Sequence, residues 1–249
     1  MAGHNKWSKV KHIKAVVDAK RGKVFSKFSK EITIATKLGG ANADMNPRLR
    51  TAILAAKAAN MPNDNIDRAV KKGSGELEGA IPDEALYEAY GPGGTAFLIE
   101  VVTDNRNRSA ADLRTLLNKN HGTFADAGSV SYQFNRKGEI RLSESAFDED
   151  TATELALESG ADDVTSDGED WVFYTAVENL FTVGNALKEK GHEPRSQALV
   201  YVAENTLLLS DLDIAKQVVH LHEVLSDYDD TQNVYSNFDI SDDIADSLG

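Results

Sequence analysis

The chain has 249 residues, of which 41% are hydrophobic and 27% charged, and its formal net charge is −13. This length favours two or three domains, and the composition is that of a soluble globular protein. The sequence contains no cysteine, which excludes disulfides, thiolate metal sites and a cysteine nucleophile. No segment has the apolar length of a signal peptide or a membrane span, so we expect a cytoplasmic protein without a membrane partner.

Charge is divided unevenly along the sequence. Residues 1–72 hold 16 Lys and Arg against 5 Asp and Glu, a net charge of +11. Residues 73–249 hold 11 against 35, a net charge of −24. Because such a separation implies different partners for the two portions, we expect the basic portion to attract a polyanion and the acidic portion to repel one.

The basic portion reads as helical. From Asp18 to Leu38, apolar residues recur three or four positions apart, and Gly39 and Gly40 supply a C-terminal stop. The members of this apolar stripe are Phe25, Phe28, Ile32, Ala35 and Leu38. A second row, which we call the lysine row, consists of Lys20, Lys23, Lys27, Lys30 and Lys37. Since the two rows lie roughly 150° apart around a helix, the apolar stripe should be buried while the lysine row faces outward.

Two further helices are predicted in this portion. One starts at the cap Asn46 with Pro47 in the first helical position and runs to Met61, and the other covers residues 63–73. The segment 73–84, GSGELEGAIPDE, has the composition of a linker. It coincides with the change in the sign of the charge, so we place a domain boundary there.

The acidic portion alternates strands and helices. We predict a strand over 96–103, a helix over 109–119, a hairpin whose strands flank Asn135–Lys137, a helix over 212–226 and a strand over 233–238 that pairs with 96–103. Between residues 137 and 205 the expected order is β-α-β-β-α-β, the split βαβ pattern of ferredoxin-like domains. These elements predict an α+β protein.

Motifs for catalysis are absent from the sequence. His220 and His222 are two positions apart on a predicted helix, so their side chains point in different directions and do not form a metal site. The glycine-rich turn 91–94 lacks the lysine and the following helix of a phosphate-binding loop. We therefore predict no enzyme, no cofactor, no metal and no small-molecule substrate, and keep an enzyme with an accessory basic module as a minor alternative.

Nucleic acid is the predicted partner. The candidate contacts are basic side chains and one aromatic: Lys6, Trp7, Lys9, Lys11, Lys14, Lys20, Arg21, Lys23, Lys27, Lys30, Lys37, Arg106 and Arg108. Lysines release counterions from phosphates, and Trp7 could stack on a base. Three alternatives stay open: the lysines form an ordinary solvated face, Trp7 packs the leader onto the helices, and Arg106 and Arg108 cap and orient the adjacent helix.

Several long segments resemble the signature sequences of the YebC family. These segments are GHNKWSKVKHIKA, DAKRGKVFSKFSKEI, NPRLR, NMPNDNIDRA, YGPGGTAFLIEVVTDNRNR and GSVSYQFNRKG, collinear from Gly3 to Gly138. Asn5 and Ile13 depart from the usual pattern and reduce the basic charge slightly. The resemblance implies a helical N-terminal domain over 1–75, a middle α/β domain formed by 76–130 and 206–249, and an inserted ferredoxin-like domain over 131–205.

Bacterial members of that family are described as transcriptional regulators, and a mitochondrial relative as a translational activator. The resemblance thus implies a DNA-binding transcriptional regulator. The alternative is a ribosome-associated translation factor that binds rRNA or tRNA while its acidic domains meet ribosomal proteins. Lysines outnumber arginines among residues 1–72, and since lysine suits backbone contact better than base reading, we expect weak sequence specificity.

Overall fold

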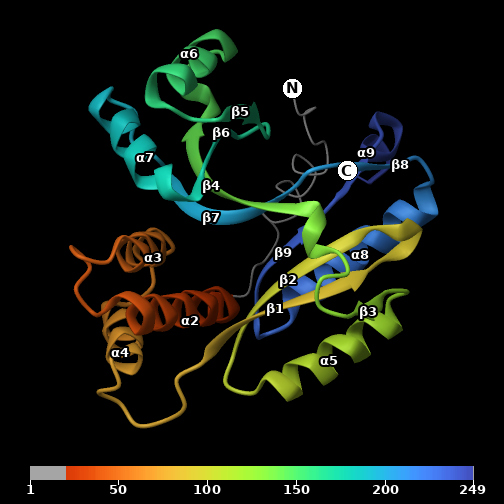
Figure 1. Ribbon diagram of the computed structural model, residues 1–249, viewed down its shortest axis with the longest axis horizontal. Coiled ribbons are helices and arrows are strands. Elements are labelled where there is room, and N and C mark those ends of the chain that lie inside the picture. The colour runs from red at the N-terminus through yellow and green to blue at the C-terminus, as the bar shows by residue number, and fades with distance from the viewer. Residues whose placement is uncertain (1–20, 249) are drawn as a thin grey trace.

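The computed structural model describes residues 21–248, and it is a mixed protein of helices and sheets (Figure 1). Its first part contains three helices, α2 (Arg21–Gly39), α3 (Pro47–Ala58) and α4 (Asn63–Gly73). The Asn46 side chain accepts a hydrogen bond from the backbone N–H of Leu49, so the predicted cap of the second helix is confirmed. Ile32, Leu49 and Ile66 form the centre of a hydrophobic cluster between the three helices.

A four-stranded antiparallel sheet follows, with the strand order β3-β1-β2-β9. Its strands are β1 (Asp83–Tyr90), β2 (Ala96–Thr103), β3 (Thr123–Ala125) and β9 (Thr231–Ser236). The predicted pairing of the late strand with the strand over 96–103 is confirmed, with Ile99 opposite Val234. The sheet therefore joins residues that are far apart in the sequence.

Two helices cover one face of this sheet, α5 (Arg106–Lys119) and α8 (Leu212–Asp227). Phe97 and Ile99 of β2 point toward Leu113 of α5 and Leu221 of α8 in one buried cluster. Ala96 and Leu98, which alternate with them, pack on the other face against Val130 and Phe134 and against Tyr201 and Tyr235. Both faces of β2 are thus buried, as its continuous apolar run predicts.

A second four-stranded sheet has the order β5-β6-β4-β7 and is antiparallel throughout. Its elements in chain order are β4 (Phe134–Ser143), α6 (Glu149–Ser159), β5 (Asp163–Ser166), β6 (Asp170–Thr175), α7 (Leu180–Glu189) and β7 (Ser196–Ala203). Both helices pack on one face, where Leu155 and Leu187 meet Phe173. The chain order here is the β-α-β-β-α-β sequence of elements that the pattern predicts.

Several sequence-based expectations are wrong in detail. The hairpin around Asn135–Lys137 does not form, because Phe134–Ser143 is one continuous strand that pairs with β7 along its first eight residues. Leu38, assigned to the apolar stripe of α2, is 64% exposed and is not part of the hydrophobic cluster between the three helices. The prediction did not include β1, β3, β8 (Leu207–Leu209), β10 (Phe238–Ile240) or α9 (Asp242–Leu248).

Within residues 21–248, no helix is both long enough and apolar enough to cross a membrane.

Candidate nucleic-acid interface

Three residues of the lysine row, Lys23, Lys27 and Lys30, contact the end of α8 and the start of β9. Figure 1 shows α2 beside β9. We call the residues that these lysines meet, 226–232, the acidic loop. Lys23 Nζ donates to the backbone oxygen of Asp227 at 2.9 Å, and Lys27 Nζ donates to that of Ser226 at 3.1 Å. Lys30 Nζ donates to the backbone oxygen of Asp229 at 2.6 Å. Three lysines on neighbouring turns of α2 therefore each bind a backbone carbonyl of the acidic loop.

The acidic loop attracts cations for two physical reasons. The last carbonyls of a helix have no partner within the helix and carry the negative end of its dipole, and here they belong to α8. Carboxylates add to this charge, because Asp227 Oδ2 lies 3.5 Å and Asp229 Oδ1 4.0 Å from Lys23 Nζ. Both carboxylates are exposed, so each of these pairs contributes little alone.

Asp230 is different because its side chain is only 11% exposed and has several donors. Lys30 Nζ lies 2.8 Å from Oδ1, whereas Arg108 Nη2 and Ser109 Oγ each lie 2.9 Å from Oδ2. Burial by itself would raise the pKa of Asp230, but the bonds from Lys30, Arg108 and Ser109 hold that pKa well below its ordinary value. Two residues predicted to bind nucleic acid, Lys30 and Arg108, thus share one buried carboxylate.

A second set of ion pairs fixes the other end of the helical part to β1. Lys37 Nζ forms an ion pair with the exposed carboxylate of Asp83, and its hydrogen bond lowers the pKa of that aspartate. Arg48 of α3 binds Glu31 of α2 through two nitrogens and also reaches Glu84 of β1. Burial of Arg48 would lower its pKa, but the two glutamates raise it above its usual value.

The expectation that the lysine row faces outward is therefore wrong for Lys23, Lys27 and Lys30, which contact the acidic loop. The heptad-like spacing places the row opposite the apolar stripe, as predicted, but a distant part of the chain covers it. The reason is electrostatic, since the net charges of the two portions have opposite signs. Whether the lysine row also binds nucleic acid stays a prediction.

The other predicted contacts fall into two groups. Arg106 and Arg108 lie at the start of α5, where Arg106 donates to the backbone oxygen of Glu84 and Arg108 also pairs with Asp104. Asn105, not an arginine, caps that helix by accepting from the N–H of Arg108. Outside the described residues lie Lys6, Trp7, Lys9, Lys11, Lys14 and Lys20, and Arg21 opens the described part of α2.

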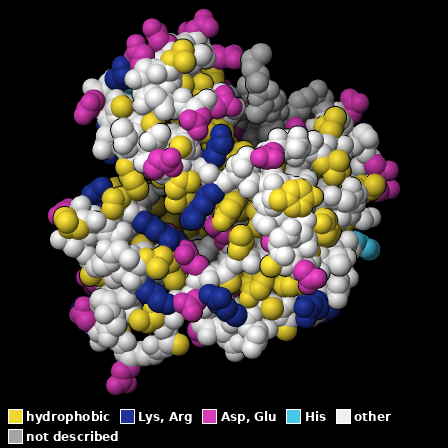
Figure 2. All heavy atoms as spheres, viewed as in Figure 1, with side chains coloured by type: hydrophobic (Ala, Val, Ile, Leu, Met, Phe, Trp, Pro, Cys, Tyr) yellow, Lys and Arg dark blue, Asp and Glu magenta, His cyan; other side chains and the backbone are white. Residues whose placement is uncertain are grey.

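Sequence reasoning did not single out the cations of α3 and α4. Among the described residues, Lys57, Arg68 and Lys71 are exposed and take part in no ion pair. In α4, Arg68 and Lys71 are mixed with the acids Asp64 and Asp67, and in α3 Lys57 is separated from the other cations, so none of the three stood out. Figure 2 shows Lys and Arg side chains around the hollow in the middle of its face, with hydrophobic side chains between them.

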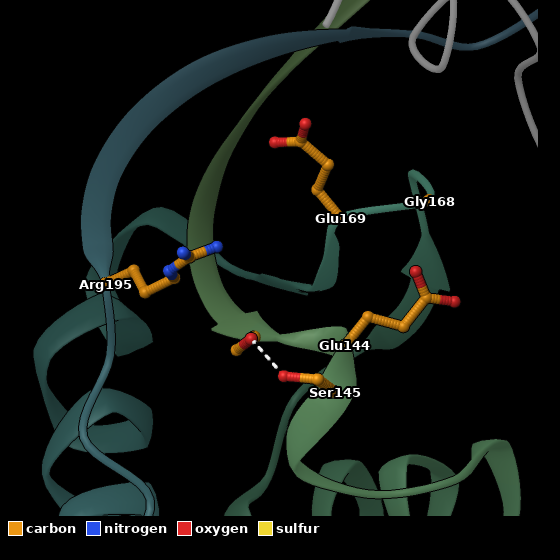
Figure 3. Close-up of a pocket in the computed structure, with 6 residues that line it drawn as sticks. Glu144, Ser145, Gly168, Glu169 and Arg195 are labelled. Atoms are coloured by element: carbon orange, nitrogen blue, oxygen red, sulfur yellow. Dashed lines mark hydrogen bonds between the residues drawn. The ribbon is translucent and has the colours of Figure 1, made fainter.

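A separate hollow lies at one end of the β4–β7 sheet (Figure 3). Glu144, Glu169 and Arg195 extend around it from three different segments. Their charges already have partners: the Glu144 carboxylate accepts from Ser166 at 2.7 Å, and Arg195 binds Asp170 at 2.6 Å. Ser145 shares a hydrogen bond of 2.9 Å with Ser143. Arg195 and Asp170 thus form an ion pair, whereas Glu144 and Ser145 are hydrogen-bonded to serine hydroxyls.

Comparisons with known proteins place the chain in a family. A family described as the TACO1/YebC protein N-terminal domain matches residues 5–76, and one described as the TACO1/YebC second and third domain matches residues 82–238. The chain belongs to the TACO1/YebC family, and the resemblance noted in the sequence is confirmed.

Relatives match along the whole chain. A protein of Akkermansia muciniphila called "Probable transcriptional regulatory protein" is 55% identical over 251 residues and is covered completely, as is this chain. A protein of Desulfatibacillum aliphaticivorans with the same name is 50% identical, with 98% of each chain covered. The crystal structure of a conserved hypothetical protein from Aquifex aeolicus is 43% identical, has a TM-score of 0.86, and matches over 92% of this chain and 94% of that one.

Proposed function

We propose that the chain is a non-enzymatic, nucleic-acid-binding regulator of gene expression whose basic N-terminal portion contacts phosphates. The observation that carries this proposal is the separation of charge, +11 over residues 1–72 and −24 over the rest. A regulatory role agrees with the names of the relatives. Each lysine that neutralises a phosphate releases counterions, which gives affinity without a requirement for sequence.

We propose further that the molecule works as three units in the cytoplasm. Residues 1–75 are the binding unit, residues 76–130 with 206–249 form a discontinuous middle unit, and residues 131–205 form an acidic unit. Separate hydrophobic clusters in these stretches support the division. The net negative charge of the last two units limits their contact with phosphates and orients the binding unit toward its ligand.

DNA is the first candidate ligand, and we propose a transcriptional regulator with weak base specificity. The second candidate is the RNA of the ribosome. It is favoured by the predominance of lysine in the basic portion, which suits contacts along a structured backbone better than bidentate base reading. The name of the family joins TACO1 and YebC members, and both candidate ligands would bind the same basic portion of the chain.

Two measurements on the full chain separate these ligands. A cell lysate that contains the tagged chain is sedimented through a gradient, and promoter duplexes are titrated with the purified chain in the presence of nonspecific competitor. Retention on one promoter in excess competitor supports the transcriptional regulator. Co-migration with ribosomes that survives DNase treatment supports the translation factor. Absence of binding to any duplex, RNA or ribosome contradicts the proposed function.

A further inference from the structure

The acidic loop binds Lys23, Lys27 and Lys30 of the lysine row and so restricts what else these lysines can bind. An ammonium group has three donor hydrogens, and Lys30 directs Nζ at both the Asp229 oxygen and Asp230 Oδ1. Lys27 donates to the backbone oxygen of Ser226 and also reaches that of Gln232 at 3.4 Å. A phosphate oxygen can therefore replace these contacts only after α2 and the acidic loop have separated.

The acidic loop also has the chemistry of the ligand that it would exclude. It presents backbone oxygens at the negative end of α8 together with the carboxylates of Asp227, Asp229 and Asp230 along one side of α2. A nucleic-acid strand presents anionic oxygens to a basic helix in a comparable series. The loop thus acts as an internal substitute for a phosphate backbone.

The loop is held in this position from its other side. Asp230 receives Arg108, Ser109 and Thr103 from the end of β2 and the start of α5, with Thr103 Oγ1 at 3.1 Å. Because these donors belong to the middle sheet and its helix, the loop keeps its shape when α2 leaves. Movement of the helical part, rather than of the loop, would then open the lysine row.

We propose that the acidic loop is an autoinhibitory contact, which occupies Lys23, Lys27 and Lys30 of the lysine row in the free protein and must separate from them before they bind nucleic acid. This inference rests on the proposed function. Because the docked form cannot bind through the row, the apparent affinity is reduced by the fraction of molecules that are undocked. Coupling of this kind typically changes affinity by about 5- to 150-fold.

The first test compares two variants with the same change in charge. Asp227, Asp229 and Asp230 are replaced by asparagine to weaken the loop, and the matched control is D150N/E154Q/E178Q. The control acids are exposed on or beside α6 and α7. Affinity for a short fluorescent DNA duplex and for an RNA hairpin is measured on the full chain. We expect the loop variant to bind at least about 5-fold more tightly than the control, and equal affinities would overturn the autoinhibitory contact.

A second test uses an unaltered loop, in case the loop variant is unfolded. The chain has no cysteine, so Ser26→Cys on α2 and Gln217→Cys on α8, both at exposed positions, accept spin labels selectively. We expect the distance between the labels to lengthen when the duplex saturates the protein, and an unchanged distance at saturation would overturn the inference. If the wild-type chain binds the duplex and the distance stays unchanged, only the autoinhibitory contact is contradicted. If no form of the chain binds DNA or RNA, the proposed function is contradicted as well.

Discussion

The two faces of α2 differ in how far along the chain their partners lie. The apolar face packs on α3 and α4, which follow within 35 residues in the chain, through Ile32 and Ala35. The lysine face packs on residues about 200 positions away, through Lys23, Lys27 and Lys30. An apolar face is satisfied by any close-packed apolar neighbour, whereas the partner of a charged face depends on the tertiary arrangement of the whole chain.

This difference bears on how a cluster of basic residues is interpreted. A stripe of lysines on a helix indicates affinity for anions, but an internal anion can meet that affinity as well as a nucleic acid can. The energies also differ, because burial of apolar surface is retained at any ionic strength while exposed ion pairs are screened by salt. We therefore expect the apolar face to determine the stability of the helical part, and the lysine face to determine its position and binding.

The largest effect is expected on the apolar face. Ile32→Ala removes three carbon atoms from a side chain with no exposed surface and should lower the local free energy of unfolding by about 2 to 5 kcal/mol. Hydrogen exchange of the α2 amides in the full chain measures this loss. Leu38→Ala on the same helix is the control, and since Leu38 is 64% exposed it should cost less than about 1 kcal/mol. Equal losses would contradict the packing of α2.

A smaller effect is expected from the buried carboxylate. Asp230→Asn removes the charge that Lys30 and Arg108 share and should destabilise the contact between α2 and the acidic loop by about 2 to 4 kcal/mol. Asp229→Asn is the control, because its carboxylate is 81% exposed and should contribute less than about 1 kcal/mol. Hydrogen exchange of α2 and of the acidic loop measures both. Similar values for the two variants would show that Asp230 does not organise this contact.

The lysines themselves should alter binding more than stability. Replacement of Lys23, Lys27 and Lys30 by glutamine should reduce the slope of log affinity against log salt by about 3, since each lost phosphate contact lowers it by about 1. The matched control, K57Q/R68Q/K71Q, removes three cations of the same helical part that form no ion pair among the described residues. A larger reduction of the slope in the control would show that the phosphate contacts lie on α3 and α4 rather than on α2.

The smallest effect is expected from pH. The folded protein holds the pKa of Asp230 below its ordinary value, so the stabilisation is present above the unfolded pKa of about 3.9 and is lost as pH falls toward the folded pKa. The contact of α2 with the acidic loop should therefore weaken below about pH 4. In Asp230→Asn this dependence should flatten, as monitored by the distance between labels at positions 26 and 217. An equally steep pH dependence in the variant would show that other carboxylates, and not Asp230, cause the weakening of the contact.

Local signals made most of the fold predictable. Asn46 and Pro47 predict the start of α3, because the side-chain cap and the fixed φ of proline both act within the first turn of the helix. The apolar run of β2 predicts a central strand. Short edge strands such as β3 and β8 have three residues each, too few for a periodic pattern. The strand β4 was split in the prediction because Asn135–Lys137 is polar, although pairing with β7 keeps it extended.

The candidate site was predictable only in part. The lysine row could be found because five lysines recur on one side of a helix and acids are scarce around them. The partner of the lysine row could not be predicted. In the sequence, Asp230 is only one of two adjacent acids in a polar stretch. The role of Asp230 arises only when β9 pairs with β2 and brings this residue beside Arg108 and Ser109.

The measurement closest to the central claim is a crosslinking map of the full chain on native nucleic acid. Cells that express the chain are irradiated, and the peptides that carry nucleotide adducts are identified by mass spectrometry. The account predicts adducts within residues 1–75, including peptides that contain the lysine row. Adducts confined to residues beyond 75 would contradict it.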